Sequence, residues 1–253
     1  MKSANPIKKN CEGIINMPTL SESTDVSGEK ETSLYALILA GGAGQRMGSE
    51  IPKQFIELAG KPVLMHTLQV FADFGNRIEI ILVLPENQIE QWKQLCRKYE
   101  FQIPHRVATG GTERFFSVKN GLDLIETDGI VFIHDGVRPL VSHQTLQRCF
   151  DMAMLQGNAL PVVSVSESLR LTEQNFSRPV DRNNIKLVQT PQTFRVHLIK
   201  EAYKQPYNSI FTDDASVLEN SGQNIYITEG NRENIKITWP ADLVWAEAVL
   251  SQQ

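Results

Sequence analysis

Four glycines and two basic residues gather in the segment from residue 41 to residue 53. They are Gly41, Gly42, Gly44, Gly48, Arg46 and Lys53. Glycine adopts backbone conformations that other residues avoid, and it lets main-chain N–H groups approach phosphate oxygens closely. Two cations beside such a loop would stabilise the negative charge that a polyphosphate gains during a reaction. The segment therefore predicts a nucleotide site with Arg46 and Lys53 as catalytic residues.

Two common glycine-rich nucleotide motifs fit this segment less well. A P-loop contains Gly-Lys-Ser or Gly-Lys-Thr, and no Lys-Ser or Lys-Thr pair follows these glycines. A dinucleotide fingerprint could begin at Gly42 and Gly44, but Met47 stands where its last glycine belongs. A tight turn without a ligand would explain the glycines, although it would leave both cations unexplained.

A second glycine turn, Gly110-Gly111-Thr112-Glu113-Arg114, precedes Ser117 in a helix-like segment. Backbone groups and the Ser117 hydroxyl could form the floor of a nucleobase site and bind the polar edge of the base. The alternative is a plain turn in which Thr112 is the N-cap of the helix.

A third cluster, His134-Asp135-Gly136-Val137-Arg138, ends a buried strand-like run. Open α/β sheets bind ligands at the carboxyl ends of their strands. Arg138 could bind a phosphate there while Asp135 holds a sugar hydroxyl or steadies a cation. A surface ion pair of little energetic value is the alternative. His134 is expected to be structural rather than a general base.

Three later segments add polar groups: Asp181-Arg182, Gln189-Thr190-Pro191-Gln192 and Thr212-Asp213-Asp214-Ala215-Ser216. Thr212 is a plausible N-cap, with two acids in the first turn of the helix that follows. Lys236 lies in a short β-like segment whose alternation points it away from its apolar neighbours. A solvated lysine is the alternative there.

From residue 34 onward, strand-like and helix-like segments alternate along the chain. Strands are predicted at 34–40, 78–84, 130–134, 159–165 and 224–228, and helices at 63–74, 86–99, 113–125, 145–155, 213–221 and 241–250. This pattern predicts a Rossmann-like α/β domain, 34–253, with a mainly parallel sheet and helices on both faces. Residues 166–188 break the alternation, which is typical of a functional or interfacial excursion.

Composition excludes several classes of protein. The chain has 253 residues, 41% of them hydrophobic, and a net charge of −4, so no basic field indicates a nucleic-acid partner. No apolar run approaches the roughly 20 residues that span a bilayer. Residues 1–33 are polar and are expected to be a disordered extension, with no signal peptide. The few, scattered cysteines favour a cytoplasmic protein with reduced thiols.

Together these pieces resemble the 2-C-methyl-D-erythritol 4-phosphate cytidylyltransferases of the non-mevalonate isoprenoid pathway, from about residue 34 onward. The resemblance is carried by a set of motifs in order: A-G-G-x-G-x-R-M-G with P-K-Q, G-G-x-x-R-x-x-S, H-D-x-x-R-P, D-R, T-P-Q, T-D-D-A and N-I-K-x-T. Two departures are Gly136-Val137 and the segment Ser166-Glu167-Ser168-Leu169-Arg170, and neither removes a matched charged group.

The resemblance implies roles for particular residues. Arg46 and Lys53 would stabilise the transition state, and Arg182 and Lys236 would hold the acceptor phosphate as the other catalytic residues. The CTP pocket would include Ala40, Gly41, Gly42, Gly44, Gly111, Thr112 and Ser117. Acceptor contacts would come from Asp135, Arg138, Thr190 and Thr212. Arg182 would come from a partner chain, on a protruding β-arm that interlocks a homodimer.

The reaction implied is cytidylyl transfer from CTP to methylerythritol phosphate. Mg²⁺ would be held mainly by the CTP phosphates, and no protein metal site is expected. Two alternatives stay open: a cytidylyltransferase for ribitol 5-phosphate or another polyol phosphate, and a non-catalytic nucleotide-binding module. Retention of Arg46, Lys53, Arg182 and Lys236 together argues against the module, since a binder needs no acceptor clamp.

Overall fold

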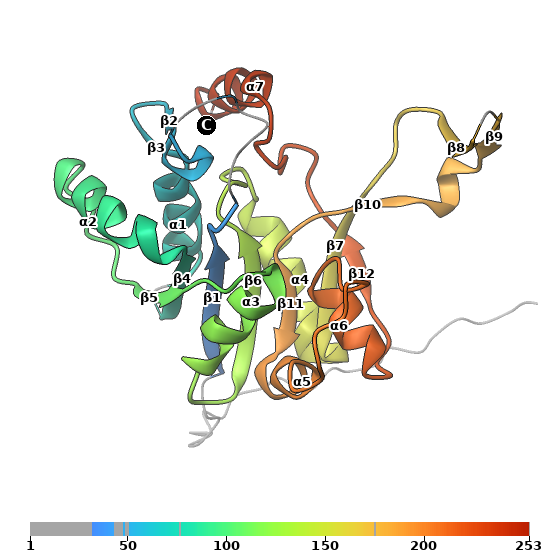
Figure 1. Cartoon of the computed structure of the whole chain (residues 1–253), viewed down its shortest axis with the longest axis horizontal. Coiled ribbons are helices and arrows are strands. Elements are labelled where there is room, and N and C mark those ends of the chain that lie inside the picture. The colour runs from blue at the N-terminus through green and yellow to red at the C-terminus, as the bar shows by residue number, and fades with distance from the viewer. Residues whose placement is uncertain (1–31, 43–47, 49–50, 76, 175, 253) are drawn as a thin grey trace, which may run out of the picture. The chain divides into compact units, whose positions relative to one another are not determined.

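The computed structural model describes residues 32–42, 48, 51–75, 77–174 and 176–252. Its centre is an eight-stranded sheet in the order β10-β7-β11-β6-β1-β4-β5, with β12 also paired to β7 (Figure 1). The strands are β1 (Ser33–Leu39), β4 (Ile78–Leu84), β5 (Arg106–Thr109), β6 (Gly129–Asp135), β7 (Asn158–Ser164), β10 (Lys186–Val188), β11 (Gln192–Arg195) and β12 (Ile227–Glu229).

The middle of the sheet is parallel. Strands β6, β1, β4 and β5 run in one direction, and β12 runs parallel to β7. Two of these strands are antiparallel to the rest. Strand β11 lies between β6 and β7 and is antiparallel to both, and β10 is antiparallel to β7. The sheet is mixed and mostly parallel, which confirms the predicted α/β class.

Helices cover both faces of the sheet. They are α1 (Val63–Phe74), α2 (Ile89–Lys98), α3 (Arg114–Asp123), α4 (His143–Gln156), α5 (Val196–Ala202), α6 (Asp214–Asn220) and α7 (Pro240–Leu250). Side chains of a strand alternate between its two faces. Ala36 and Ile38 of β1 therefore pack in one core with α1, α2 and α4, whereas Tyr35 and Leu37 pack in the other with α3, α5 and α6.

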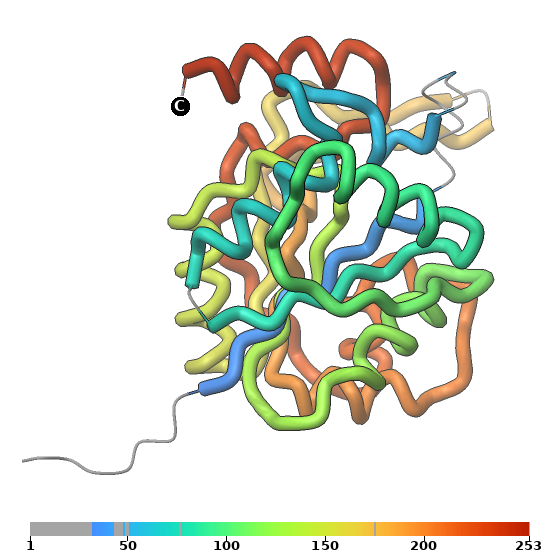
Figure 2. The backbone as a smooth tube through the Cα atoms, turned by 90° about the vertical axis from the view of Figure 1, so that its left-hand side faces the viewer, coloured from blue at the N-terminus to red at the C-terminus, as the bar shows by residue number. Residues whose placement is uncertain are grey.

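A smaller apolar cluster lies beyond the carboxyl ends of the parallel strands. Leu58 of the hairpin β2 (Glu57–Leu58) and β3 (Lys61–Pro62) packs there with Val137, Ile237 and Ala246 of α7. Figure 2 shows α7 crossing this end of the domain. The cluster fixes the loop after β6 and the segment before α7 against each other.

Most predicted elements have the observed type, with shifted ends. The predicted helix 63–74 and strand 78–84 coincide with α1 and β4, while the predicted helix 86–99 splits into η3 (Glu86–Gln88) and α2. Strand β1 begins at Ser33, inside the predicted extension; residues 1–31 lie outside the described part of the chain. Strand β12 begins at Ile227, later than predicted, because the Asn158 side chain bonds the backbone of Asn224 and Tyr226.

The irregular region contains a separate hairpin. Strands β8 (Leu169–Glu173) and β9 (Phe176–Val180) pair antiparallel and extend away from the sheet in Figure 1. Phe176 at the tip is 80% exposed. The chain returns through η4 (Arg182–Asn184) and rejoins the main sheet as β10, so the excursion ends before residue 186. A role of this hairpin in dimerisation stays a prediction.

Candidate active site

The site begins where β1 and β6 end side by side. Leu39 and Asp135 are register partners at the carboxyl ends of these parallel strands. Gly136 N donates to Leu39 O at 2.8 Å, and Ala40 N donates to Val83 O of β4 at 2.9 Å. The glycine loop and the loop after β6 therefore leave the sheet as neighbours, at the edge where open α/β sheets bind ligands.

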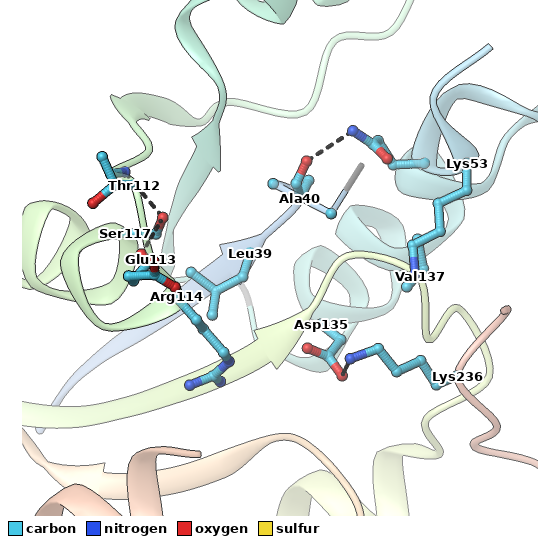
Figure 3. A pocket seen from close by; sticks show the side chains of 14 residues that line it. Leu39, Ala40, Lys53, Thr112, Glu113, Arg114, Ser117, Asp135, Val137 and Lys236 are labelled. Atoms are coloured by element: carbon cyan, nitrogen blue, oxygen red, sulfur yellow. Dashed lines mark hydrogen bonds and ion pairs between the residues drawn. The ribbon is translucent and has the colours of Figure 1, made fainter. Parts of the chain in front are cut away.

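A first cavity, of about 290 Å³, opens above the end of β1 (Figure 3). Its lining includes every described residue of the predicted nucleotide pocket, together with Lys53: Ala40, Gly41, Gly42, Gly111, Thr112 and Ser117. Gly44 and Arg46 lie outside the described residues. The structure thus brings the two glycine turns to one cavity, and the nucleotide roles stay predictions.

Lys53 is held against the glycine loop by its own short element. It begins the 3-10 turn η2 (Lys53–Phe55) and is only 8% exposed. Next to it, Gln54 Nε2 donates to Ala40 O at 2.8 Å, drawn as a dashed line at Ala40 in Figure 3. A Cβ on Gly42 would come within 3.3 Å of Lys53 Cε. The loop backbone therefore lies directly against the lysine side chain.

The second glycine turn is shaped by close packing. A Cβ on Gly111 would lie 2.3 Å from Phe116 Cβ, which no side chain permits. Gly111 N donates to Ser117 Oγ at 3.0 Å, and Ser117 Oγ donates to Glu113 O at 3.2 Å. The hydroxyl is thus already engaged within the turn. In the alternative of a plain turn Thr112 would be the N-cap of the helix, but the N-cap of α3 is Glu113.

A second cavity, of about 340 Å³, adjoins the first. All predicted acceptor residues line it, together with Lys236: Asp135, Arg138, Thr190 and Thr212. Arg114, Asp135 and Lys236 line both cavities. Ligands in the two cavities would therefore meet at these three side chains.

Asp135 organises the charges at this junction. Its Oδ2 accepts from Arg138 Nε and pairs with Lys236 Nζ, both at 3.1 Å. Burial acts to raise the pKa of Asp135, but the positive charges of Lys236 and Arg138 hold it below its usual range. The carboxylate is ionised at neutral pH and keeps both cations at the cavity wall.

His134 is a neutral structural histidine, as predicted. Burial lowers its pKa to about 4, so the ring carries no charge near pH 7. Because Arg138 O can only accept, His134 Nε2 donates to it at 3.0 Å, and His134 Nδ1 then accepts from Thr190 Oγ1 at 3.1 Å. Thr190 Oγ1 also accepts from Asp135 N. The threonine hydroxyl has no proton left to donate to a ligand.

An ion pair that the sequence did not indicate fixes Arg114, which lines both cavities, to a fully buried carboxylate. Arg114, the first residue of α3, forms two hydrogen bonds of 2.7 and 2.6 Å with the fully buried Asp214 of α6. Tyr203 Oη donates to the same carboxylate at 2.6 Å. Both charged residues stand in the quoted motifs, but the local pattern placed Asp214 only in the first turn of a helix. The N-cap is Asp213, with a capping box to Ser216, so the expectation for Thr212 is wrong.

Comparison with known proteins identifies the family. The family model described as 2-C-methyl-D-erythritol 4-phosphate cytidylyltransferase matches residues 34–252. The chain belongs to this family. The cytidylyltransferase of this name from Bacteroides fragilis is 53% identical over 215 residues, 85% of this chain and 98% of the relative. That from Porphyromonas gingivalis W83 is 50% identical over 222 residues, 87% of this chain and 99% of the relative.

Solved structures of the cytidylyltransferase family have the same fold. The structure of 4-diphosphocytidyl-2C-methyl-D-erythritol synthase from Anaerococcus prevotii aligns with a TM-score of 0.73 at 25% identity, covering 87% of this chain and 99% of the other. The 2-C-methyl-D-erythritol 4-phosphate cytidylyltransferase of Thermus thermophilus aligns with a TM-score of 0.69 at 30% identity, covering 87% and 100%.

One predicted catalytic residue of the cytidylyltransferase pattern lies apart from the others. Arg182 lines neither cavity, and its Nη1 donates to Ser166 O at the base of the hairpin. Asp181 caps the short turn η4 that carries it. Within one chain the structure brings Lys53 and Lys236 to the cavities but not Arg182.

Two absences apply to the described residues of this family member. Among them, no group of three or more His, Cys, Asp or Glu side chains could hold a metal ion. No helix in the same part of the chain is long and apolar enough to cross a membrane.

Proposed function

We propose that this chain transfers the cytidylyl group of CTP to 2-C-methyl-D-erythritol 4-phosphate. The products are 4-diphosphocytidyl-2-C-methyl-D-erythritol and pyrophosphate. The observation that carries the proposal is the pair of adjoining cavities that share Arg114, Asp135 and Lys236. A donor and an acceptor in these cavities meet at one point, as group transfer requires. Family membership, with relatives about 50% identical, supports the substrates.

The acceptor needs no general base in this reaction. A phosphate monoester loses its second proton with a pKa of about 6, so an oxygen nucleophile is present near neutral pH. That oxygen bonds to the α-phosphorus of CTP in line, while the bond from the α-phosphorus to the bridging oxygen breaks. Pyrophosphate leaves with the electron pair. His134, neutral and fully bonded inside the protein, takes no part.

Stabilising charge on the donor is the proposed role of Lys53. Its side chain lies against the backbone of the glycine loop, in the first cavity. Negative charge builds on the α-phosphate oxygens as the new bond forms, and a fixed cation in a buried site stabilises it. Arg46, proposed to act with Lys53, lies outside the described residues.

Holding the acceptor is the proposed role of Lys236 and Arg138. Both cations are fixed to Oδ2 of Asp135 at the junction of the cavities. Among the described residues no hydrogen bond is made to the other oxygen, Oδ1, so Asp135 can accept from a polyol hydroxyl. Thr190 helps to fix Asp135, because its Oγ1 accepts a hydrogen bond from Asp135 N.

The donor set fits a magnesium ion that is bound mainly by CTP. Mg²⁺ commonly takes one or two carboxylates and completes its shell with water and substrate phosphates. Here the described residues offer one carboxylate at the cavities' junction, Asp135, and it is already paired with two cations. When bound, Mg²⁺ would neutralise triphosphate charge and orient the leaving pyrophosphate.

We further propose a homodimer in which each hairpin completes the partner's site. Arg182 lies outside both cavities of its own chain, although the family pattern assigns it to the acceptor phosphate. The hairpin beside it exposes Leu171 and Phe176, at 42% and 80%. Apolar side chains of this exposure are typical of a surface that another chain covers.

One assay tests the proposed function. The purified protein is incubated with CTP and Mg²⁺ and with each candidate acceptor, and pyrophosphate release is measured. Release with methylerythritol phosphate supports the proposal. Release with ribitol 5-phosphate alone would identify a different polyol phosphate cytidylyltransferase, and CTP binding without release on any acceptor would indicate a non-catalytic binding module.

A further inference from the structure

We propose that Asn234 is a positioning residue that holds the acceptor clamp, Lys236 and Arg138, in place. It acts through hydrogen bonds to the backbone and to Arg138, and its own side chain lines neither cavity. The inference rests on the proposed function, because it assigns these cations to the acceptor. It adds a residue whose effect is specific to one of the two substrates.

Asn234 is the meeting point of three chain segments. Its side chain is fully buried, and Nδ2 donates to Thr190 O at 2.7 Å. Its main-chain oxygen accepts from Arg138 Nη1 at 2.8 Å and from Gln189 Nε2 at 3.2 Å. The residue thereby links the chain after β10 and the loop after β6 to the segment that leads to Lys236.

Arg138 depends on this arrangement for its orientation. Its guanidinium spans two acceptors, with Nε on Asp135 Oδ2 and Nη1 on Asn234 O. A guanidinium bonded at two points is fixed in plane and direction, whereas one bonded at a single point can rotate. Moving Asn234 O would free one of these two points.

Lys236 depends on it as well. Residues 234–238 form no helix or strand, so no regular hydrogen-bond ladder holds them. The segment is fixed at one end by Asn234 and at the other by Ile237 N, which donates to Val137 O at 2.9 Å. Lys236, between these points, reaches Asp135 Oδ2 at 3.1 Å. Loss of the Asn234 side chain would remove the bond to Thr190 O and so weaken the first anchor.

Asn158 offers a matched control for a purely structural asparagine. It is 3% exposed, its Nδ2 donates to Asn224 O at 2.9 Å, and its Oδ1 accepts from Tyr226 N at 3.0 Å. It opens β7 and lines neither cavity. Asn158→Ala therefore removes at least as many buried hydrogen bonds as Asn234→Ala without touching the clamp.

The test measures the KM of each substrate and the urea midpoint for Asn234→Ala and Asn158→Ala. Both variants should unfold at lower urea than the wild type, because each leaves buried backbone groups without a partner. Asn234→Ala should raise the acceptor KM about tenfold or more and change the CTP KM less than about twofold. Asn158→Ala should leave both KM values unchanged.

Three results would overturn the proposal: an unchanged acceptor KM in Asn234→Ala, an equal rise in both KM values, or the same selective rise in Asn158→Ala. Asn234→Ser, a smaller change, is measured in the same way, so that poor folding of the alanine variant does not decide the outcome. Wild-type turnover of methylerythritol phosphate is measured first and reports on the proposed function alone.

Discussion

Lys53 and Lys93 carry the same charged group, but their surroundings differ in how strongly they screen that charge. Lys93 has a side chain that is 57% exposed beside Glu90, so water and salt screen its charge. Lys53 is 8% exposed and lies against the glycine loop, to which the neighbouring Gln54 is hydrogen-bonded at Ala40 O. A charge fixed in this way needs no reorganisation when negative charge develops nearby.

Lys53→Ala should lower turnover by about 10²-fold or more, because one preorganised donor contributes about 3–4 kcal/mol to the transition state. Initial rates of pyrophosphate release with saturating CTP and acceptor measure the effect. The exposed Lys93→Ala serves as the control and should keep the wild-type rate. Near-normal turnover of Lys53→Ala, in a folded protein, would rule out its proposed role.

His134 should make the protein sensitive to mild acid. Burial lowers its pKa to about 4, against 6.5 for an ordinary histidine, so the unfolded chain binds its proton more readily between these values. The free energy of unfolding is therefore not reduced by His134 above about pH 6.5, and it falls as the pH is lowered from 6.5 towards 4. From pH 7 to pH 5 the loss assigned to His134 is about 2 kcal/mol.

Urea unfolding at pH 7 and pH 5 measures this loss, and His134→Gln isolates it. The variant should start less stable but lose about 2 kcal/mol less between the two pH values than the wild type. His66, whose pKa burial also lowers, is present in both proteins and cancels in the comparison. An equal loss in both proteins would show that another group causes the acid sensitivity.

At the scale of elements, α3 and α6 are joined by the pair Arg114–Asp214. The two helices pack on the same face of the sheet, and each begins at a cavity wall. Arg114 keeps 34% of its side chain exposed, whereas Asp214 has none. The pair therefore fixes the start of α3, directly after the second glycine turn, to the start of α6.

Asp214→Ala should lower the free energy of unfolding by about 1–3 kcal/mol, because it leaves the buried Tyr203 hydroxyl without its acceptor, while the partly exposed Arg114 can bind water instead. Chemical unfolding at pH 7 measures the change. Glu219, an exposed acid on the same helix, is the matched control, and Glu219→Ala should alter stability by less than about 0.5 kcal/mol. A small effect of Asp214→Ala would mean that Tyr203 and water replace the lost contacts.

For the whole molecule, the proposed dimer can be tested by subunit complementation. Suppose Lys53 acts in its own chain and Arg182 in the partner's site. Mixed dimers of Lys53→Ala and Arg182→Ala then contain one site with both residues intact. After equal amounts are unfolded and refolded together, activity should recover to about one quarter of the wild type, because half the dimers are mixed.

Lys53→Ala mixed with Lys236→Ala is the control. Both residues line cavities of the same chain, so no mixed dimer of this kind has an intact site and activity should stay low. Recovery in the control, or no recovery in the test mixture, would contradict the sharing of Arg182 between chains. Sedimentation of the mixtures establishes that dimers are present.

The sequence by itself determined the fold class and the identity of the chemical groups. Long apolar runs such as 78–84 and amphipathic helices such as 63–74 have strong local periodicity, so the structure reproduces them closely. The glycine turns and the Asp135–Arg138 cluster carried enough local pattern to be assigned to a ligand site. The sequence did not predict the short strands β5 and β11, because four residues are too few to give a periodic signal.

Only the tertiary structure decided which groups work together. Arg114 and Asp214 are separated by 100 positions, so no local pattern could reveal that they pair. Thr190 has its only proton engaged by His134, and Asn234 bonds Thr190, through contacts that exist once β6, β11 and the segment before α7 are assembled. The sequence gives the chemical type of each group. Hydrogen bonds and ion pairs depend on distances in space, which are set only when the chain is packed.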